Sequence, residues 1–328
     1  MLSQIFISLI CVSLIAYLFY LRLFYLGFSS KKKIINNKKQ TVSVVIAARN
    51  EEQTLPRLLT VLVNQSYSAE LYEVIVANDG STDRTAEIVE KFAAKWPHIK
   101  LVNVEGREGV ISPKKNALTQ AIALAKNEII LSTDADCLVG KYWIEAMVKE
   151  YDDAETAMVC GFSKTLPGKW DLVSLVKKFE HFDFIAIFSA AAGAMGSGKY
   201  FSCSGQNISY RKNDFNEVGG FSKIWHLISG DDVNLMQLFR KSGKKIKFSL
   251  NYHSFATTRS VDSWSELFNQ RSRWASNMKW QLRLNPEFFI YLISAFLLTV
   301  FTIGLVFIEW WLPIPIFAIR ILFEYSFL

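Results

Sequence analysis

Two long apolar runs, one towards each end of the chain, most limit what this sequence can fold into. Residues 4–28 carry a single charge, at Arg22, and residues 288–308 form a second run. A helix that crosses a bilayer needs roughly 20 apolar residues, so both runs are long enough. A third run, residues 311–328, follows almost at once and contains two prolines. The sequence leaves open whether this run is a third span, a re-entrant segment or a truncated one.

Basic residues beside both apolar runs predict which side of a membrane the middle of the chain occupies. They are Lys31, Lys32, Lys33, Lys38 and Lys39 after the first run, and Arg271, Arg273, Lys279 and Arg283 before the second. Basic flanks remain on the cytoplasmic side. We therefore expect a multi-pass integral membrane protein with a cytoplasmic domain, in the plasma or inner membrane if bacterial. A cleaved signal peptide is the alternative for the first run, but its basic residues would precede the apolar stretch.

The formal net charge of +7 is compatible with nucleic acid, an anionic membrane surface or an anionic substrate. The basic residues gather beside the apolar runs, which favours a membrane surface, and the sequence has no nucleic-acid-binding motif. We therefore expect no nucleic-acid partner. The four cysteines, Cys11, Cys137, Cys160 and Cys203, include no Cys-x-x-Cys pair. Neither a zinc site nor a disulfide framework is indicated, and reduced thiols are expected.

From Thr41 onward, predicted strands alternate with predicted helices. Short β-branched runs predict strands over residues 42–47, 72–77, 100–104 and 128–132. Helices are predicted over residues 54–64, 82–95 and 114–126. Such alternation indicates an α/β fold with a parallel sheet. Ligands of these sheets bind at the carboxyl ends of the strands, and polar clusters follow three of those ends here.

Two later segments are harder to interpret. Residues 172–192 mix aromatic, aliphatic and charged side chains, which favours a buried or interfacial helix over a membrane span. Residues 193–199 match the spacing of a phosphate-binding loop up to its lysine. Tyr200 follows, however, where a metal-binding Ser or Thr would be needed, so we expect a flexible loop there. A dinucleotide-binding glycine motif is also missing from the sequence.

Asp134 and Asp136 follow the fourth predicted strand directly. On an extended segment alternate residues point the same way, so both carboxylates are expected to face one metal ion. Two carboxylates together with substrate phosphates suit Mg²⁺ or Mn²⁺. A solvated turn explains Asp-Ala-Asp equally well when the motif stands alone, but its position after an apolar strand favours the metal site.

Two further acidic motifs each have a structural and a functional interpretation. Asp79 follows the second strand within Asn-Asp-Gly-Ser-Thr-Asp, where it closes a turn or accepts hydrogen bonds from a base or ribose. Asp231 and Asp232 precede an amphipathic helix, where they cap the helix or supply a general base. Adjacent carboxylates raise the pKa of one member of the pair, which suits a base.

A third motif, Gln270-Arg-Ser-Arg-Trp274, lies just before the second apolar run. A basic helix in the membrane interface explains its arginines and tryptophan. The functional alternative is that Arg273 neutralises a diphosphate leaving group, while Trp274 stacks on a sugar or acceptor.

Taken in order, these motifs resemble those of the family 2 glycosyltransferases, which have a GT-A fold. They are most similar to the membrane branch with the cellulose, chitin and hyaluronan synthases and ceramide glucosyltransferase. The match runs from about Val42 to Trp274 and includes the Lys-x-x-Ala-Leu element at Lys114 and the Gln-x-x-Arg-Trp signature. The resemblance implies that a nucleotide sugar, UDP-linked, binds at Ala47, Arg49, Glu51, Asp79, Lys114 and Asp134.

The same resemblance implies the remaining roles. Asp134 and Asp136 would hold Mg²⁺ or Mn²⁺, and Asp232 would be the catalytic base beside Asp231, which replaces the usual Glu. Leaving-group and acceptor positions would be Gly205, Asn207, Gln270, Arg273 and Trp274. The expected parts of the chain are a transmembrane helix (1–30), a GT-A domain (41–260), an interfacial amphipathic helix (261–286) and C-terminal transmembrane segments (287–328).

Fewer predicted spans follow the signature than in most polysaccharide synthases. The sequence therefore favours an inverting transfer to a lipid or lipid-linked acceptor at the cytoplasmic membrane face. A processive polysaccharide synthase, or a subunit of one, is the alternative. A non-catalytic membrane scaffold is a third interpretation, against which the intact acidic motifs argue.

Overall fold

The computed structural model describes residues 2–29, 39–106, 108–165 and 168–327. Lys31, Lys32, Lys33 and Lys38 of the predicted cytoplasmic cluster lie outside the described residues. The chain divides into two compact units. We call them the sheet unit, which comprises Lys33–Ala191 and Ser202–Met278, and the helical unit, which comprises Met1–Lys32, Ala192–Phe201 and Lys279–Leu328.

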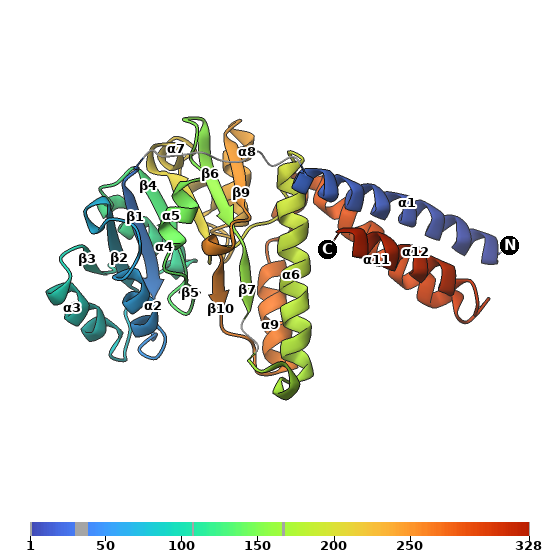
Figure 1. Cartoon of the computed structure of the whole chain (residues 1–328), viewed down its shortest axis with the longest axis horizontal. Coiled ribbons are helices and arrows are strands. Elements are labelled where there is room, and N and C mark those ends of the chain that lie inside the picture. The colour runs from blue at the N-terminus through green and yellow to red at the C-terminus, as the bar shows by residue number, and fades with distance from the viewer. Residues whose placement is uncertain (1, 30–38, 107, 166–167, 328) are drawn as a thin grey trace. The chain divides into compact units, whose positions relative to one another are not determined.

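The sheet unit is built on a large, mostly parallel sheet (Figure 1). Its strands are β1 (Val42–Ala48), β2 (Tyr72–Asn78), β3 (Ile99–Asn103), β4 (Ile129–Ser132), β6 (Thr156–Gly161), β8 (Ile208–Arg211) and β9 (Lys245–Ser249). They lie in the order β3-β2-β1-β4-β8-β6-β9, and β8 runs antiparallel to both neighbours. The chain builds β2 and β3 on one side of β1 and then crosses to β4 on the other. Such a switch point opens a crevice at the carboxyl ends of the strands.

A small second sheet in the same unit has the strand order β5-β10-β7. Its strands are β5 (Leu138–Val139), β7 (Ser163–Thr165) and β10 (Ala256–Thr258). The strand β5 begins two residues after Asp136, so this sheet directly adjoins the predicted metal site.

The helices of the sheet unit include all those predicted in its first half. The helices of the unit are α2 (Leu55–Leu62), α3 (Thr85–Lys95), α4 (Pro113–Leu124), α5 (Trp143–Val148), most of α6 (Leu175–Gly196), α7 (Lys212–Glu217), α8 (Val233–Lys241) and α9 (Trp264–Ala275), with short 3₁₀ turns η1 (Ala69–Leu71), η2 (Trp170–Leu172), η3 (Ser222–Ile224) and η4 (Tyr252–Ser254). The predicted strands and helices of this half are present, with ends displaced by a few residues at most. The structure confirms the α/β class.

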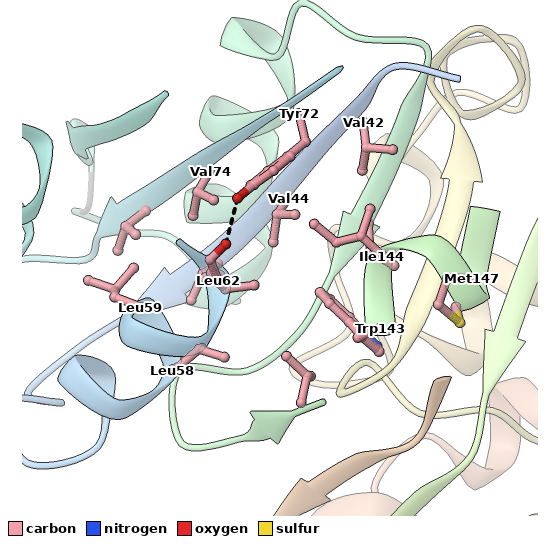
Figure 2. Close-up of a cluster of buried hydrophobic side chains, with 14 of the residues drawn as sticks. Val42, Val44, Leu58, Leu59, Leu62, Tyr72, Val74, Trp143, Ile144 and Met147 are labelled. Carbon is pink, nitrogen blue, oxygen red and sulfur yellow. Dashed lines mark hydrogen bonds between the residues drawn. The ribbon is translucent and has the colours of Figure 1, made fainter. Parts of the chain in front are cut away.

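One face of the large sheet is covered by α2 and α5 (Figure 2). The buried leucines of α2 recur at the three- and four-residue spacing of one helix face, at Leu55, Leu58, Leu59 and Leu62. They pack on alternate residues of β1 and β2, such as Val44. The Tyr72 hydroxyl donates a hydrogen bond of 2.7 Å to the Leu62 carbonyl oxygen. Each such buried leucine stabilises the fold by about 1.5–3 kcal/mol, and α4 packs on β1 and β2 as well.

The helical unit contains α1 (Leu2–Ser29), most of α10 (Met278–Leu284), α11 (Pro286–Leu305) and α12 (Pro313–Phe327). Among the described residues, two helices are long and apolar enough to cross a membrane, over Gln4–Ser29 and Pro286–Leu305. The third predicted run forms α12, whose 15 residues rise about 22 Å, less than the roughly 30 Å of a hydrocarbon core.

The helix α6 (Leu175–Gly196) is continuous over 22 residues, and its last residues belong to the helical unit. There Gly193 and Gly196 lie against Gly27 of α1, where a Cβ added to Gly27 would be 1.9 Å from the Gly193 carbonyl oxygen. The Ser197 hydroxyl donates to the Leu23 carbonyl at 2.6 Å. The loop predicted over residues 193–199 is therefore wrong as far as Gly196. These glycines permit close helix packing, which the loop-like spacing concealed.

Residues 261–286, predicted as one amphipathic helix, contain two helices, α9 and α10. The break falls at Ser276 and Asn277. The Ser276 hydroxyl donates to the Arg273 carbonyl at 2.7 Å, and the Asn277 amide donates to the Ser229 hydroxyl at 2.7 Å. Both side chains therefore bond to backbone or loop groups where a continuous helix would have run on.

Candidate active site

Hydrogen bonds tie the segment after β1 to the segment after β2. The backbone N–H of Thr82 donates to the Asn50 side chain at 2.8 Å, and that of Glu51 donates to the Thr85 hydroxyl at 2.8 Å. Asn50 has a φ of 57°, a left-handed conformation that asparagine tolerates better than most residues. Asp79 is 5% exposed, and its N–H bonds to the last residue of β1. The predicted nucleotide-binding ends of β1 and β2 therefore form one connected surface.

Asp134 and Asp136 converge in the turn that follows β4. Their carboxylates and the Cys137 thiol offer ligand atoms that all lie within 4.8 Å of one another. A hydrogen bond of 3.1 Å from the Cys137 N–H to the Asp134 carbonyl closes the turn. The sequence predicted an extended segment here, but the turn brings the carboxylates together. Burial, followed by the charge of Asp134, raises the pKa of Asp136 above its usual value.

The chemistry of this ligand set fits Mg²⁺ or Mn²⁺. Burial and the two carboxylates raise the pKa of the Cys137 thiol well above its usual value, and a soft sulfur ligand suits a hard divalent cation poorly. Two carboxylates remain, and hard divalent cations prefer oxygen ligands. A cation held between Asp134 and Asp136 would also relieve the repulsion that raises the pKa of Asp136.

Glu51 lies close enough to this pair to respond to its charge. Burial raises the pKa of Glu51, and the charges of Asp136 and Asp134 raise it further. Of the neighbouring predicted residues, Ala47 is half-buried within β1 and Arg49 is exposed just beyond its end. The structure thus places Glu51 within range of the charges of Asp134 and Asp136, which we call the metal pair, and leaves Arg49 at the surface.

Lys114, in the first turn of α4, connects the metal pair with the acidic pair before α8. Its Nζ lies 2.8 Å from an Asp134 oxygen and 3.1 Å from an Asp231 oxygen. Burial alone would lower the pKa of Lys114, but Asp134 and Asp231 outweigh it and hold the pKa well above its usual value. Lys114 therefore stays cationic and holds two acidic motifs that are far apart in the sequence.

Asp232 is the N-cap of α8 and has both carboxylate oxygens engaged. One accepts the Val233 N–H at 2.6 Å, and the other accepts the Gly205 N–H at 2.8 Å. A Cβ on Gly205 would lie 3.1 Å from an Asp231 oxygen and 3.4 Å from the Lys114 Nζ, so a larger residue would press on the Asp231 carboxylate. Burial and the adjacent charge of Asp231 raise the pKa of Asp232 to about 6.

Asn207, predicted to contact the leaving group or acceptor, requires a correction. Its side chain is fully buried. The Trp143 indole N–H donates to its amide oxygen at 3.0 Å, and its amide nitrogen donates to the carbonyls of Phe162 and Ser254 at 2.9 and 2.7 Å. These bonds leave the amide no way to touch an acceptor. Asn207 instead fixes the loop that carries Gly205.

Asn207→Ala is therefore expected to lower the free energy of unfolding by about 2–4 kcal/mol, because it leaves buried polar groups without partners. Thermal or urea unfolding of the purified protein measures this change. The matched control is Asn64→Ala, which removes an exposed amide bonded to the Thr60 carbonyl. If Asn207→Ala unfolded like the control and yet lost sugar transfer, a direct role at the acceptor would be restored.

The predicted residues of α9 are Gln270, Arg273 and Trp274, and the structure places them in different surroundings. The Gln270 amide oxygen accepts from Arg271 at 2.5 Å, and the Arg271 guanidinium lies 4.0 Å from the centre of the half-exposed Trp274 ring. The Arg273 side chain is exposed, and its carbonyl accepts from the Ser229 hydroxyl at 3.2 Å. Within the described residues, no ion pair joins Arg273 to Asp134 or Asp136. The structure therefore connects the backbone of α9 to the segment before Asp231.

Lys115 was missed by the sequence reasoning. Its side chain is fully buried, and its Nζ donates to the carbonyls of Ile224, at 3.2 Å, and Leu227. Burial lowers the pKa of Lys115. The lysine thus fastens the loop that leads to the acidic pair. The sequence offers no signal that separates its role from that of Lys114.

Comparisons with known proteins bear on the family and the fold of the chain. The sequence model of "Glycosyl transferase family 2" matches residues 43–219, more than half of the chain. "Probable glycosyltransferase YdaM" of Bacillus subtilis (strain 168) is 27% identical over 256 residues, which are 76% of this chain and 58% of the relative. "Beta-monoglucosyldiacylglycerol synthase" of Nostoc sp. (strain PCC 7120 / SAG 25.82 / UTEX 2576) is 25% identical over 244 residues, which are 74% of this chain and 50% of the relative. The chain spans about half of the length of these relatives.

Among solved structures, the mannosyltransferase PcManGT of Pyrobaculum calidifontis, in complex with GDP-Man and Mn²⁺, is similar over nearly its whole length. The TM-score is 0.68 at 18% sequence identity, and the alignment covers 98% of this chain and 91% of that one. At this identity the likeness concerns the fold.

Proposed function

Because the chain belongs to glycosyltransferase family 2, we propose that it moves a sugar from a UDP-linked donor to a lipid or lipid-linked acceptor at the cytoplasmic face of a membrane. The chain is a glycosyltransferase with a GT-A fold, and members of the family use nucleotide-sugar donors. One observation carries the proposal: Lys114 joins the metal pair, through Asp134, to the acidic pair, through Asp231. Donor and acceptor chemistry thereby share one site.

The donor lies across the carboxyl ends of β1, β2 and β4. Asp134 and Asp136 would hold Mg²⁺ or Mn²⁺, which would supply positive charge to the diphosphate leaving group. Asp79 accepts hydrogen bonds from the base or ribose, with Ala47, Arg49 and Glu51 lining the same edge. Lys114 holds the diphosphate beside the acidic pair, Asp231 and Asp232. The choice of UDP rests on the motif resemblance.

Asp232 is the general base. Its deprotonated carboxylate takes the proton from the acceptor hydroxyl while that oxygen bonds to the anomeric carbon. The bond from this carbon to the diphosphate breaks in the same displacement, which inverts the anomeric configuration. The Gly205 and Val233 N–H groups fix the direction of the carboxylate. Gln270, Arg273 and Trp274 are proposed to serve the leaving group and acceptor from α9.

An exposed apolar surface on the sheet unit supports the proposal that the acceptor lies at a membrane. It comprises Trp170, Leu172, Leu175, Phe179, Phe182, Trp264 and Phe268 of η2, α6 and α9. The helices α6 and α9 lie side by side (Figure 1), and the ring centres of Phe179 and Trp264 are 5.5 Å apart. The Lys178 ammonium lies 5.3 Å from the Trp170 ring centre. Tryptophans and lysines on an apolar face are typical of a helix in the membrane interface.

Sugar transfer in membranes that contain the protein tests the proposal. Membranes are incubated with a panel of radiolabelled UDP- and GDP-sugars and Mn²⁺, and the product is extracted into organic solvent and sized. We expect one donor to label a lipid that carries a single sugar. A ladder of long glycans would instead identify a processive synthase. No transfer from any donor, with the protein folded, would favour the scaffold interpretation.

A further inference from the structure

Arg259, which the sequence motifs did not single out, lies at the same end of the small sheet as Asp136. In the antiparallel pair of β10 and β5, Ala256 lies opposite Val139 and Thr257 lies opposite Leu138. Because the pair is antiparallel, the chain that enters β5 from Asp136 and the chain that leaves β10 towards Arg259 lie at the same end of the small sheet.

Electrostatics agree with this placement. The pKa of Arg259 is raised above its usual value, chiefly by the carboxylate of Asp262, with smaller contributions from Glu266 and Asp136. Asp136 therefore lies near enough for its charge to act on the guanidinium. Lys114 forms its ion pair with the other carboxylate of the metal pair, Asp134.

The backbone around Arg259 is fixed, whereas its side chain is weakly held. The N–H of the buried Val261 donates to the fully buried Glu180 carboxylate at 3.0 Å. The Arg259 side chain is 68% exposed and forms an ion pair with Asp262, three residues along. Asp262 is shared, because Lys177 also pairs with it, at 2.6 Å. Exposed ion pairs of this kind contribute little to stability, so a stronger anion readily displaces one.

We propose that Arg259 is a diphosphate-binding residue, which leaves Asp262 and contacts the phosphates of the donor when they bind at Asp134 and Asp136. The inference rests on the proposed function. The planar guanidinium offers two parallel N–H donors that match phosphate oxygens, and it stays charged at any working pH. Lys177 remains as the partner of Asp262 after Arg259 has moved.

The charges at the site favour a cation in addition to Lys114 and Arg273. A nucleoside diphosphate brings its negative charge to an edge that already holds Asp134, Asp136 and Glu51. Lys114 is shared by two carboxylates, so one divalent ion and this lysine leave an excess of negative charge. Arg259 supplies the further positive charge on the side of Asp136.

Binding of UDP and of GDP to the purified full-length protein in Mn²⁺, measured by calorimetry, tests this inference. Arg259→Gln is expected to weaken binding of the preferred diphosphate at least tenfold and to leave binding of the free nucleoside unchanged. Arg259→Lys restores part of the affinity. The matched control is Lys91→Gln on α3, which removes a cation paired with Glu87 and is expected to leave binding unchanged.

Asp262→Asn is expected to have the opposite effect on diphosphate binding. Because it removes the carboxylate that competes with the phosphates, it is expected to tighten diphosphate binding severalfold. Equal binding by wild type and a folded Arg259→Gln variant would overturn the role of Arg259, and weaker binding by Asp262→Asn would overturn the exchange of partners. If the wild type binds neither UDP nor GDP, the proposed function itself fails.

Discussion

Asp232→Asn is expected to remove nearly all sugar transfer while leaving donor binding intact. An amide cannot take the proton of an acceptor hydroxyl, and general bases contribute about 10²–10⁴-fold to rate, so we expect turnover to fall by about 10³-fold. The amide oxygen still accepts one of the two backbone N–H bonds that Asp232 receives from Gly205 and Val233. The start of α8 should therefore persist. Initial rates of radiolabelled transfer and calorimetry with UDP separate the two effects.

The matched control is Asp214→Asn, which removes one carboxylate from an ion pair with Lys244 on the same unit. It is expected to transfer sugar at nearly the wild-type rate. Undiminished transfer by a folded Asp232→Asn protein would refute the assignment of the base, whatever the identity of the donor.

Asp136→Ala is expected to lower the kcat/KM for the donor by about 10²–10³-fold, the loss seen when a group that stabilises developing charge is removed. Removing the metal from the wild type with EDTA should give a defect of similar size. Added to the variant, EDTA should cause little further loss, because the carboxylate and the ion act as one unit. For both the wild type and Asp136→Ala, transfer rates and UDP binding are measured once with Mn²⁺ and once with EDTA.

Full transfer by the wild type in EDTA would contradict the role proposed for Asp134 and Asp136. Additive losses from EDTA and Asp136→Ala would place the ion elsewhere. Glu287→Gln, which alters a carboxylate paired with Lys199 in the helical unit, controls for the loss of an acidic side chain and should leave the metal dependence unchanged.

Much of the fold was predictable because local pattern and tertiary burial agree in the first half of the chain. The β-branched runs of β1, β2 and β4 lie within the sheet, and the leucines of α2 face its core. Polar residues follow these strands at the edge where α/β sheets bind ligands, which placed Asp79 and Asp134 correctly at strand ends. The order of the motifs then identified the family.

The details that escaped prediction depend on contacts between distant segments. The turn at Asp134–Cys137 is stabilised by its own backbone bond, so an extended geometry was the wrong reason for the convergence of the carboxylates. The burial of Asn207 depends on Trp143 and Ser254, which no local pattern connects to it. The packing of Gly193 depends on Gly27, more than 160 residues earlier. Register between β5 and β10, and hence the place of Arg259, is equally non-local.

The central claim, that Asp232 is the base and that Asp231 and burial set its pKa, is tested most directly by the pH dependence of kcat/KM. Asp232 acts when deprotonated and its pKa is raised to about 6. The rate should therefore be constant above this pH and fall tenfold per unit below it. Asp231→Asn removes a neighbouring negative charge, so its acidic limb should shift to lower pH. An acidic limb that is absent, or that stays in place in Asp231→Asn, would contradict the account.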